Sequence, residues 1–168
     1  MALQNLDISD SLLELGRYLK HNKEIEDFCV TQCNKHLKVY IGDFLRKDIP
    51  TAEDTPYIVL TDFRKLEGQN VEFCTYSLDL YAGIGSNNIV TVELEEDITM
   101  PDLYDLTVKL MNLLQKVIND KEYRNRPISR IRTSGAYPIS SLGNHWVGKL
   151  EIEWRIYQTL GTQYTEEL

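Results

Sequence analysis

The sequence predicts an α+β fold, with a mixed, mainly antiparallel sheet that carries its helices packed largely on one face. Three observations predict this class. Apolar residues follow helical spacing in residues 1–36, strand-like runs recur over residues 37–160, and one long amphipathic stripe at about 101–119 separates the early strands from the late ones. A length of 168 residues favours a single domain, residues 1–168, with a short tail at 161–168.

Two helices are expected at the N-terminus. Leu12, Leu15 and Leu19 recur at helical intervals, which places them on one face of a first helix. A second helix is expected from about Lys23 to His36. Its inward-facing side chains would be Ile25, Phe28, Cys29, Gln32 and Cys33.

Short strands should follow these helices. LKVYI (37–41) is typical of a strand, and so is the run at 57–61 after Pro56. The longer aromatic and β-branched run at 71–81 is expected to pair antiparallel with 57–61. Two prolines and mixed charge over residues 43–56 predict an irregular, exposed connection.

The stretch TMPDLYDLTVKLMNLLQKVIND predicts the main helix. Thr99 and Pro101 are typical of a helix start, with Asp102 near its positive end. Its apolar stripe contains Leu103, Leu106, Leu110, Leu113, Leu114 and Val117, and its exposed side would carry Lys109, Asn112 and Lys116.

Two strands are expected to close the domain. Residues 126–135 alternate weakly, whereas GKLEIEWRIYQ alternates cleanly and predicts a half-buried antiparallel strand. One face would carry Leu150, Ile152, Trp154 and Ile156, and the other Lys149, Glu151, Glu153 and Arg155. The segment AYPISSLGNHW between these strands is expected to form a loop.

The stretch LYAGIGSNNIVTVEL (80–94) contains two glycines of the kind found in nucleotide-binding turns. A dinucleotide fingerprint needs a third glycine three positions after the second and a helix directly after it. Asn88 occupies that position and a strand-like run follows. Gly83 and Gly85 are therefore expected to form a bend with positive φ, within a flexible loop helped by Asn87 and Asn88.

The sequence contains no recognisable catalytic, cofactor or metal constellation. Ser140 and Ser141 lie near His145, but no GxSxG elbow frames them. Cys29 and Cys33 are expected on one helix face as core residues. We therefore expect no enzymatic activity, no cofactor and no metal site.

Charge is unevenly distributed. The formal net charge of −8 opposes tight, sequence-independent binding to DNA. An acidic run contains Glu93, Glu95, Glu96 and Asp97, and a basic cluster contains Arg124, Arg126, Arg130 and Arg132. Two interpretations stay open: Arg130 and Arg132 pair with Glu151 and Glu153 on a neighbouring strand, or the two clusters meet between subunits.

No apolar run is long enough to span a membrane, and the N-terminus lacks the basic and apolar regions of a secretory signal. No membrane association is expected.

The segment DTPYIVLTDFRKLEGQNVEFCTYSLDLYAG resembles the middle of phage tail terminator, or tail completion (neck), proteins. The helix LYDLTVKLMNLLQKVI and the closing strand KLEIEWRIYQ are similar to the elements that follow it in that family. The resemblance covers roughly residues 53–158 and lies in the pattern and order of elements. The extra helix at 23–36 and the loop after it depart from the family.

This resemblance implies a non-enzymatic virion component, made in the bacterial host cytoplasm and acting at the tail–neck junction. Such proteins form a ring, usually a hexamer, on the tail tube protein. They end tube growth and meet the head–tail connector protein, while DNA passes through the lumen without specific binding. We expect the acidic and basic clusters to serve as the two complementary subunit faces that a ring requires.

Two alternatives belong to other classes. One is a small cytosolic enzyme or accessory subunit with a ligand pocket near Tyr137, His145 and Trp146. The other is an adaptor of a bacterial secretion-like apparatus with the same fold.

Overall fold

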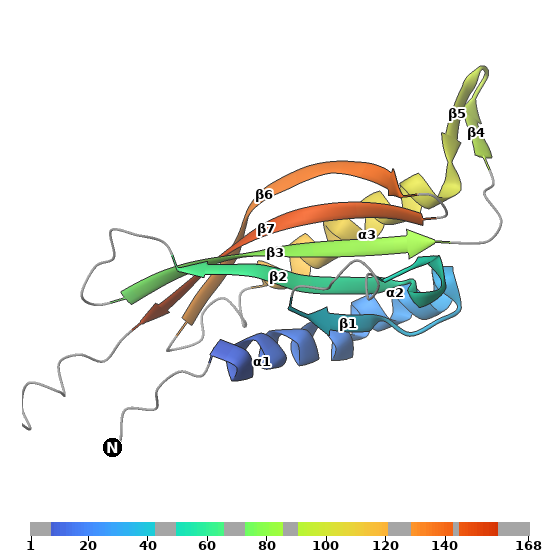
Figure 1. Ribbon diagram of the computed structural model, residues 1–168. Coiled ribbons are helices and arrows are strands. Elements are labelled where there is room, and N and C mark those ends of the chain that lie inside the picture. Colours follow the sequence, from blue (N-terminus) through green and yellow to red (C-terminus); the bar gives the residue numbers. More distant parts are fainter. Residues whose placement is uncertain are drawn as a thin grey trace, which may run out of the picture.

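The computed structural model describes residues 8–42, 50–65, 73–85, 91–120, 129–142 and 145–157. Two helices come first along these residues, and strands follow on both sides of a third helix (Figure 1). In order they are α1 (Ile8–His21), α2 (Lys23–Cys33), β1 (Lys38–Ile41), the 3-10 turn η2 (Ala52–Asp54), β2 (Tyr57–Lys65), β3 (Phe73–Gly85), β4 (Thr91–Glu95), β5 (Ile98–Pro101), α3 (Asp102–Ile118), β6 (Ser129–Leu142) and β7 (His145–Tyr157).

The strands form two separate sheets. Five of them make one sheet in the order β1-β2-β3-β7-β6, in which β1 runs parallel to β2 and the other neighbours are antiparallel. Among the described strands, β4 and β5 pair only with each other, as an antiparallel hairpin that stands clear of the main sheet (Figure 1). The predicted α+β class, with a mixed and mainly antiparallel sheet, is confirmed.

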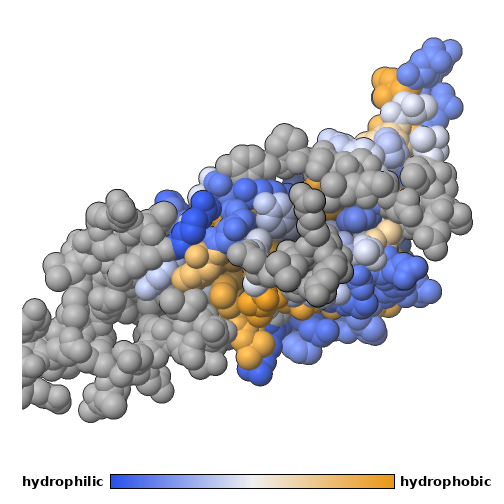
Figure 2. All heavy atoms as spheres, in the orientation of Figure 1, coloured by the Kyte–Doolittle hydropathy of each residue, from blue (hydrophilic) through white to orange (hydrophobic). Residues whose placement is uncertain are grey.

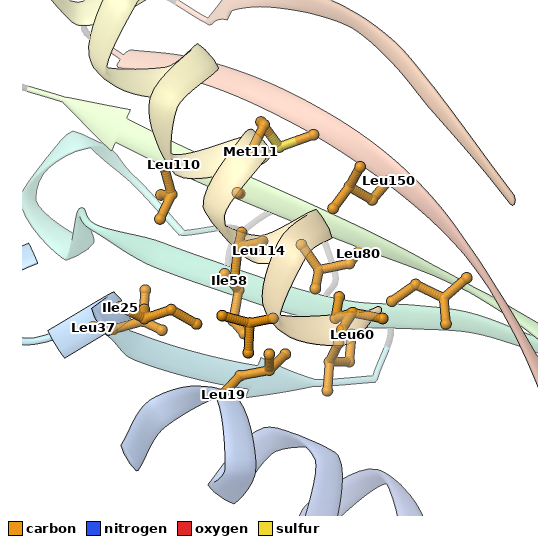
Figure 3. Packing of buried hydrophobic residues seen from close by; sticks show 14 of the residues in the cluster. Leu19, Ile25, Leu37, Ile58, Leu60, Leu80, Leu110, Met111, Leu114 and Leu150 are labelled. Atoms are coloured by element: carbon orange, nitrogen blue, oxygen red, sulfur yellow. The ribbon is translucent and has the colours of Figure 1, made fainter. Parts of the chain in front are cut away.

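All three helices contribute to one hydrophobic core on one face of the five-stranded sheet. α3 crosses the central strands, so that Leu110 and Leu114 pack with Leu80 and their neighbours (Figure 3). α1 and α2 complete the layer with Leu19 and Ile25. The predicted stripe of α3 is confirmed: Lys109, Asn112 and Lys116 are exposed, while Leu103, Leu110, Leu114 and Val117 are buried, and Leu106 and Leu113 are half-buried.

The second helix is shorter than predicted. Asn22 caps its start by accepting a hydrogen bond from Ile25 N at 3.2 Å, and Asn34 ends it in the left-handed conformation at φ 54°. The helix therefore ends at Cys33, three residues before His36. Cys29 is buried and Cys33 half-buried, as predicted, but the prediction that Gln32 faces inward was wrong because its side chain is exposed.

The predicted long helix at about 101–119 is confirmed as α3, Asp102–Ile118, with Pro101 at its N-cap. Thr99 lies before the helix in β5, because residues 98–101 pair with β4, so its predicted place at the helix start was wrong. The expected loop AYPISSLGNHW is mostly strand: β6 runs to Leu142 and β7 starts at His145. The alternation of β7 is confirmed, with Leu150, Ile152 and Trp154 buried and the intervening charged residues half-buried on the other face.

Candidate functional site

The glycines of LYAGIG are strand residues, so the predicted bend was wrong. Gly83 pairs with Val147 and Gly85 with His145 in the register of β3 and β7. Among the described glycines, Gly42 has a positive φ, of 107°, whereas Gly83 and Gly85 do not. The other half of the predicted loop, Asn87 and Asn88, lies outside the described residues.

These glycines are needed because other groups approach the backbone closely. A Cβ on Gly83 would overlap the Tyr57 ring and lie 2.7 Å from its Oη. A Cβ on Gly85 would lie 2.7 Å from His145 Cβ and 3.2 Å from Ala52 Cα. The side chain of Tyr57 therefore reaches across β3, and η2 packs over the end of the same strand. Only glycine leaves room for both approaches.

Tyr57 and His145 form a buried pair on the face of the sheet opposite the helices. A hydrogen bond of 3.0 Å joins Tyr57 Oη and His145 Nε2, with the rings edge to face. Burial raises the pKa of Tyr57 to about 12, with a smaller contribution from the Asp54 charge. Burial also lowers the pKa of His145 below its usual value. Both groups are thus neutral near pH 7. Their hydrogen bond joins β2 to the start of β7.

The other residues of the expected ligand pocket are placed differently. Trp146 stacks edge to face on Tyr104 of α3, with the ring centroids 5.4 Å apart. Trp146 therefore packs against the helix layer, whereas its neighbour His145 faces the opposite side. Tyr137 lies in β6 opposite Lys149, and its side chain lies outside the described part of the chain.

Charged side chains cover the centre of this helix-free face. Buried Asp79 lies between Lys149 and Arg64, with Oδ2 3.2 Å from Lys149 Nζ and Oδ1 3.7 Å from Arg64 Nη2. Arg132 Nη2 donates to Glu153 Oε2 at 3.0 Å. Opposite charges on adjacent strands thus pair within the chain.

The predicted basic cluster is only partly described. The interpretation that Arg132 pairs with Glu153 on a neighbouring strand is confirmed. Arg130 stands opposite Arg155 in the strand register, with its side chain outside the described part, and Arg124 and Arg126 lie outside the described residues altogether. Whether the cluster forms a subunit face stays a prediction.

The acidic run lies on the β4–β5 hairpin. Glu93 and Glu95 belong to β4, while Glu96 and Asp97 form the turn, where Asp97 adopts φ 61°. Aspartate tolerates this left-handed conformation better than most residues. All four side chains are exposed. The hairpin therefore presents a concentrated negative charge away from the body of the protein.

The same hairpin also exposes apolar side chains. Val92, Leu94 and Ile98 are 44%, 55% and 51% exposed. Val92 pairs with Met100, whereas Glu93 pairs with Thr99. Side chains alternate along each strand, so Val92 and Leu94 of β4 lie on the side of Met100 and Ile98 of β5. The register shifts between Glu93 and Glu95, which places Glu95 opposite Ile98 at the edge of this group. We call Val92, Leu94, Ile98 and Met100 the apolar hairpin face. Exposed apolar side chains that gather on one face make this face a candidate contact surface.

The predictions from sequence missed this hairpin, although a signal was present. VEL and ITM alternate apolar and polar residues on either side of the acidic turn that holds Glu96 and Asp97, which is a strand–turn–strand pattern. Local pattern alone predicts a strand for IVTVEL and a helix start at Thr99 and Pro101, and it does not reveal that the two segments pair.

Other kinds of site are not indicated in the described part of the chain. No group of three or more His, Cys, Asp or Glu side chains there is arranged to hold a metal ion. None of the described helices combines the length and the apolar content that crossing a membrane requires. Known protein families and curated proteins provide no match to this sequence.

Proposed function

We propose that the protein is a non-catalytic component of a phage or prophage virion, which caps the tail tube as a ring. In this role it ends polymerisation of the tube and joins the tail to the head connector. The observation that carries the proposal is the projecting β4–β5 hairpin with its exposed apolar face. An isolated two-stranded hairpin is marginally stable in water, so an apolar face on it favours a protein partner.

The charge of the chain supports the same proposal. A protein that surrounds a DNA passage benefits from a surface that repels phosphates, and the chain carries a net charge of −8. The resemblance of residues 53–158 to tail terminators supplies the partners: other copies of the chain, the tail tube protein and the connector protein. The protein would act in the virion, after synthesis in the bacterial host cytoplasm.

The arrangement around His145 gives less support to an enzyme with a pocket there. The His145 ring is buried, and its Nε2 already bonds Tyr57 Oη. A ligand would have to break that bond and open the contact between η2 and β3. Trp146, on the opposite side of the sheet, would not line the same pocket.

The test is the assembly state of the purified chain. Light scattering and native mass spectrometry, over a range of concentrations and with added tail tubes of the same phage, should give a closed oligomer. Negative-stain images should show a ring with a central hole. A chain that stays monomeric at every concentration and does not bind tail tubes would contradict the proposal. A small molecule retained in the native mass spectrum would support the enzyme alternative instead.

A further inference from the structure

A second exposed surface differs from the hairpin in charge. On α1, Leu13, Arg17 and Lys20 are exposed and follow i, i+4, i+7 spacing, so they form one stripe. Ile41, at the end of β1, borders this stripe: its Cδ1 lies 3.6 Å from where a Cβ on Gly16 would be. Leu13 is 41% and Ile41 38% exposed. We call Leu13, Arg17, Lys20 and Ile41 the α1–β1 patch, and Figure 2 shows apolar surface over this part of the molecule.

The charge of this patch is opposite to that of the hairpin. Residues 13–23 contain three basic side chains, Arg17, Lys20 and Lys23, and one acid, Glu14, in a chain whose net charge is −8. Lys20 Nζ donates to Leu37 O, a backbone carbonyl, so this contact leaves its charge uncompensated. The α1–β1 patch therefore combines two exposed aliphatic side chains with basic side chains. The hairpin combines three exposed aliphatic side chains with acidic side chains.

We propose that the β4–β5 hairpin of one copy docks on the α1–β1 patch of the next copy. The inference rests on the proposed ring and names the contact that builds it. Val92, Leu94 and Ile98 would cover Leu13 and Ile41, with the hairpin acids around the basic side chains of α1. Apolar contact supplies affinity, and charge complementarity sets the orientation.

The geometry favours a neighbour over the same chain. The hairpin stands clear of the body (Figure 1), and within the chain β5 contacts α3, while α1 packs on β1, α2 and α3. A five-residue strand such as β4 is about 16 Å long, enough to reach past its own subunit. Docking of hairpin on hairpin is disfavoured because each carries four carboxylates: Glu93, Glu95, Glu96 and Asp97.

A contact between two different surfaces has a symmetry consequence. Each copy then has one donor surface and one acceptor surface, so the contact repeats from copy to copy. Such a heterologous interface closes into a ring when its rotation allows and otherwise grows into a filament. The same contact thus explains self-assembly without any contribution from the Arg124–Arg132 cluster.

Two variants disable the two surfaces separately. Arg17→Glu with Lys20→Glu reverses the charge of the patch, and Leu94→Ser with Ile98→Ser removes the two most exposed side chains of the apolar hairpin face. All four side chains are exposed, so the fold should survive, which far-UV circular dichroism and thermal unfolding will check. Each variant should be monomeric at concentrations where the unaltered chain forms rings. We expect the affinity between neighbouring copies to fall by at least about thirtyfold, because residues at the centre of an interface typically contribute this much.

Matched controls separate this contact from its alternatives. Thr91→Ser with Thr99→Ser also introduces two serines, on the opposite face of the hairpin, and should leave rings intact. Arg130→Glu with Arg132→Glu reverses the same number of charges as the patch variant. Rings that survive the patch variant but are lost in this one would overturn the inference in favour of the arginine cluster.

Mixing the two disabled chains gives the decisive result. The patch variant keeps a working hairpin and the hairpin variant keeps a working patch, so together they should form a 1:1 dimer that cannot grow. Native mass spectrometry resolves this dimer from either monomer. Absence of the dimer, or rings from either variant alone, would overturn the docking contact while leaving the proposed ring in place. An unaltered chain that forms no ring would instead count against the proposed function itself.

Discussion

Substituting Gly83 with alanine should destabilise the fold, because the Tyr57 ring occupies the space of a side chain at this position. A Cβ there would overlap two ring carbons and lie 2.7 Å from the hydroxyl oxygen. Gly83 has no positive φ, so alanine adds no backbone strain of its own. Any penalty must therefore come from displacing the ring and from losing its hydrogen bond to His145.

The size of this penalty follows from three contributions. Overpacking of a tight site costs about 1–3 kcal/mol. Leaving a buried partner such as His145 without its hydrogen bond costs about 1–3 kcal/mol more. Replacing glycine with alanine inside a strand returns about 0.5–1 kcal/mol. We expect Gly83→Ala to lower the free energy of unfolding by about 3 kcal/mol, near the middle of the range of about 1–5.5 kcal/mol that these contributions span.

Urea unfolding followed by circular dichroism measures this change at a fixed protein concentration. Gly135→Ala, in β6, is the matched control. The atom nearest to a Cβ at Gly135 would be Glu151 Oε2, at 3.3 Å, which is the end of a flexible side chain. It should change stability by less than about 0.5 kcal/mol, as substitutions without a core clash usually do. In a Tyr57→Ala background, where the ring is gone, Gly83→Ala should lose most of its penalty. An equal penalty in both backgrounds would refute the explanation by close approach.

Two further predictions use the buried titratable groups. Burial lowers the pKa of His145, so near pH 6 the unfolded chain binds a proton more readily than the folded chain, and the free energy of unfolding should fall as the pH drops through about 6.5. Urea unfolding curves between pH 7.5 and 5.5 should show a weaker dependence of this free energy on pH in His145→Gln, but not in His21→Gln. Burial also raises the pKa of Cys29 to about 12, so iodoacetamide at pH 8 should modify this thiol in urea but not in the folded chain. Peptide mass spectrometry measures the modification, and rapid labelling of the folded chain would contradict the buried position of Cys29.

Elements with a strong local period were predictable from the sequence. The α3 stripe that holds Leu110 and Leu114 needs only helical spacing, and the alternation through Ile152 and Trp154 needs only the period of a strand. Both patterns are contained in neighbouring residues, so no knowledge of distant contacts is required. The class of the fold followed from the order of such segments.

Long-range contacts decided the predictions that were wrong. Gly83 suggested a bend because the sequence does not reveal that Tyr57, from another strand, lies across it. Thr99 had the chemistry of a helix start, yet pairing with Glu93 of β4 placed it in a strand. Tertiary pairing can override local preference, and a single sequence does not contain the identity of the pairing partner.

The composition of the hairpin itself argues for a specific partner. An unpaired two-stranded ribbon has two free edges, which are liable to join other strands indiscriminately. The acids Glu93, Glu95, Glu96 and Asp97 oppose this, because two such ribbons repel each other along their length. The apolar face with Val92, Leu94 and Ile98 nevertheless favours burial, so a stable complex requires a partner that is both aliphatic and positively charged. The α1–β1 patch meets both requirements, which is why we place the contact there and not between two hairpins.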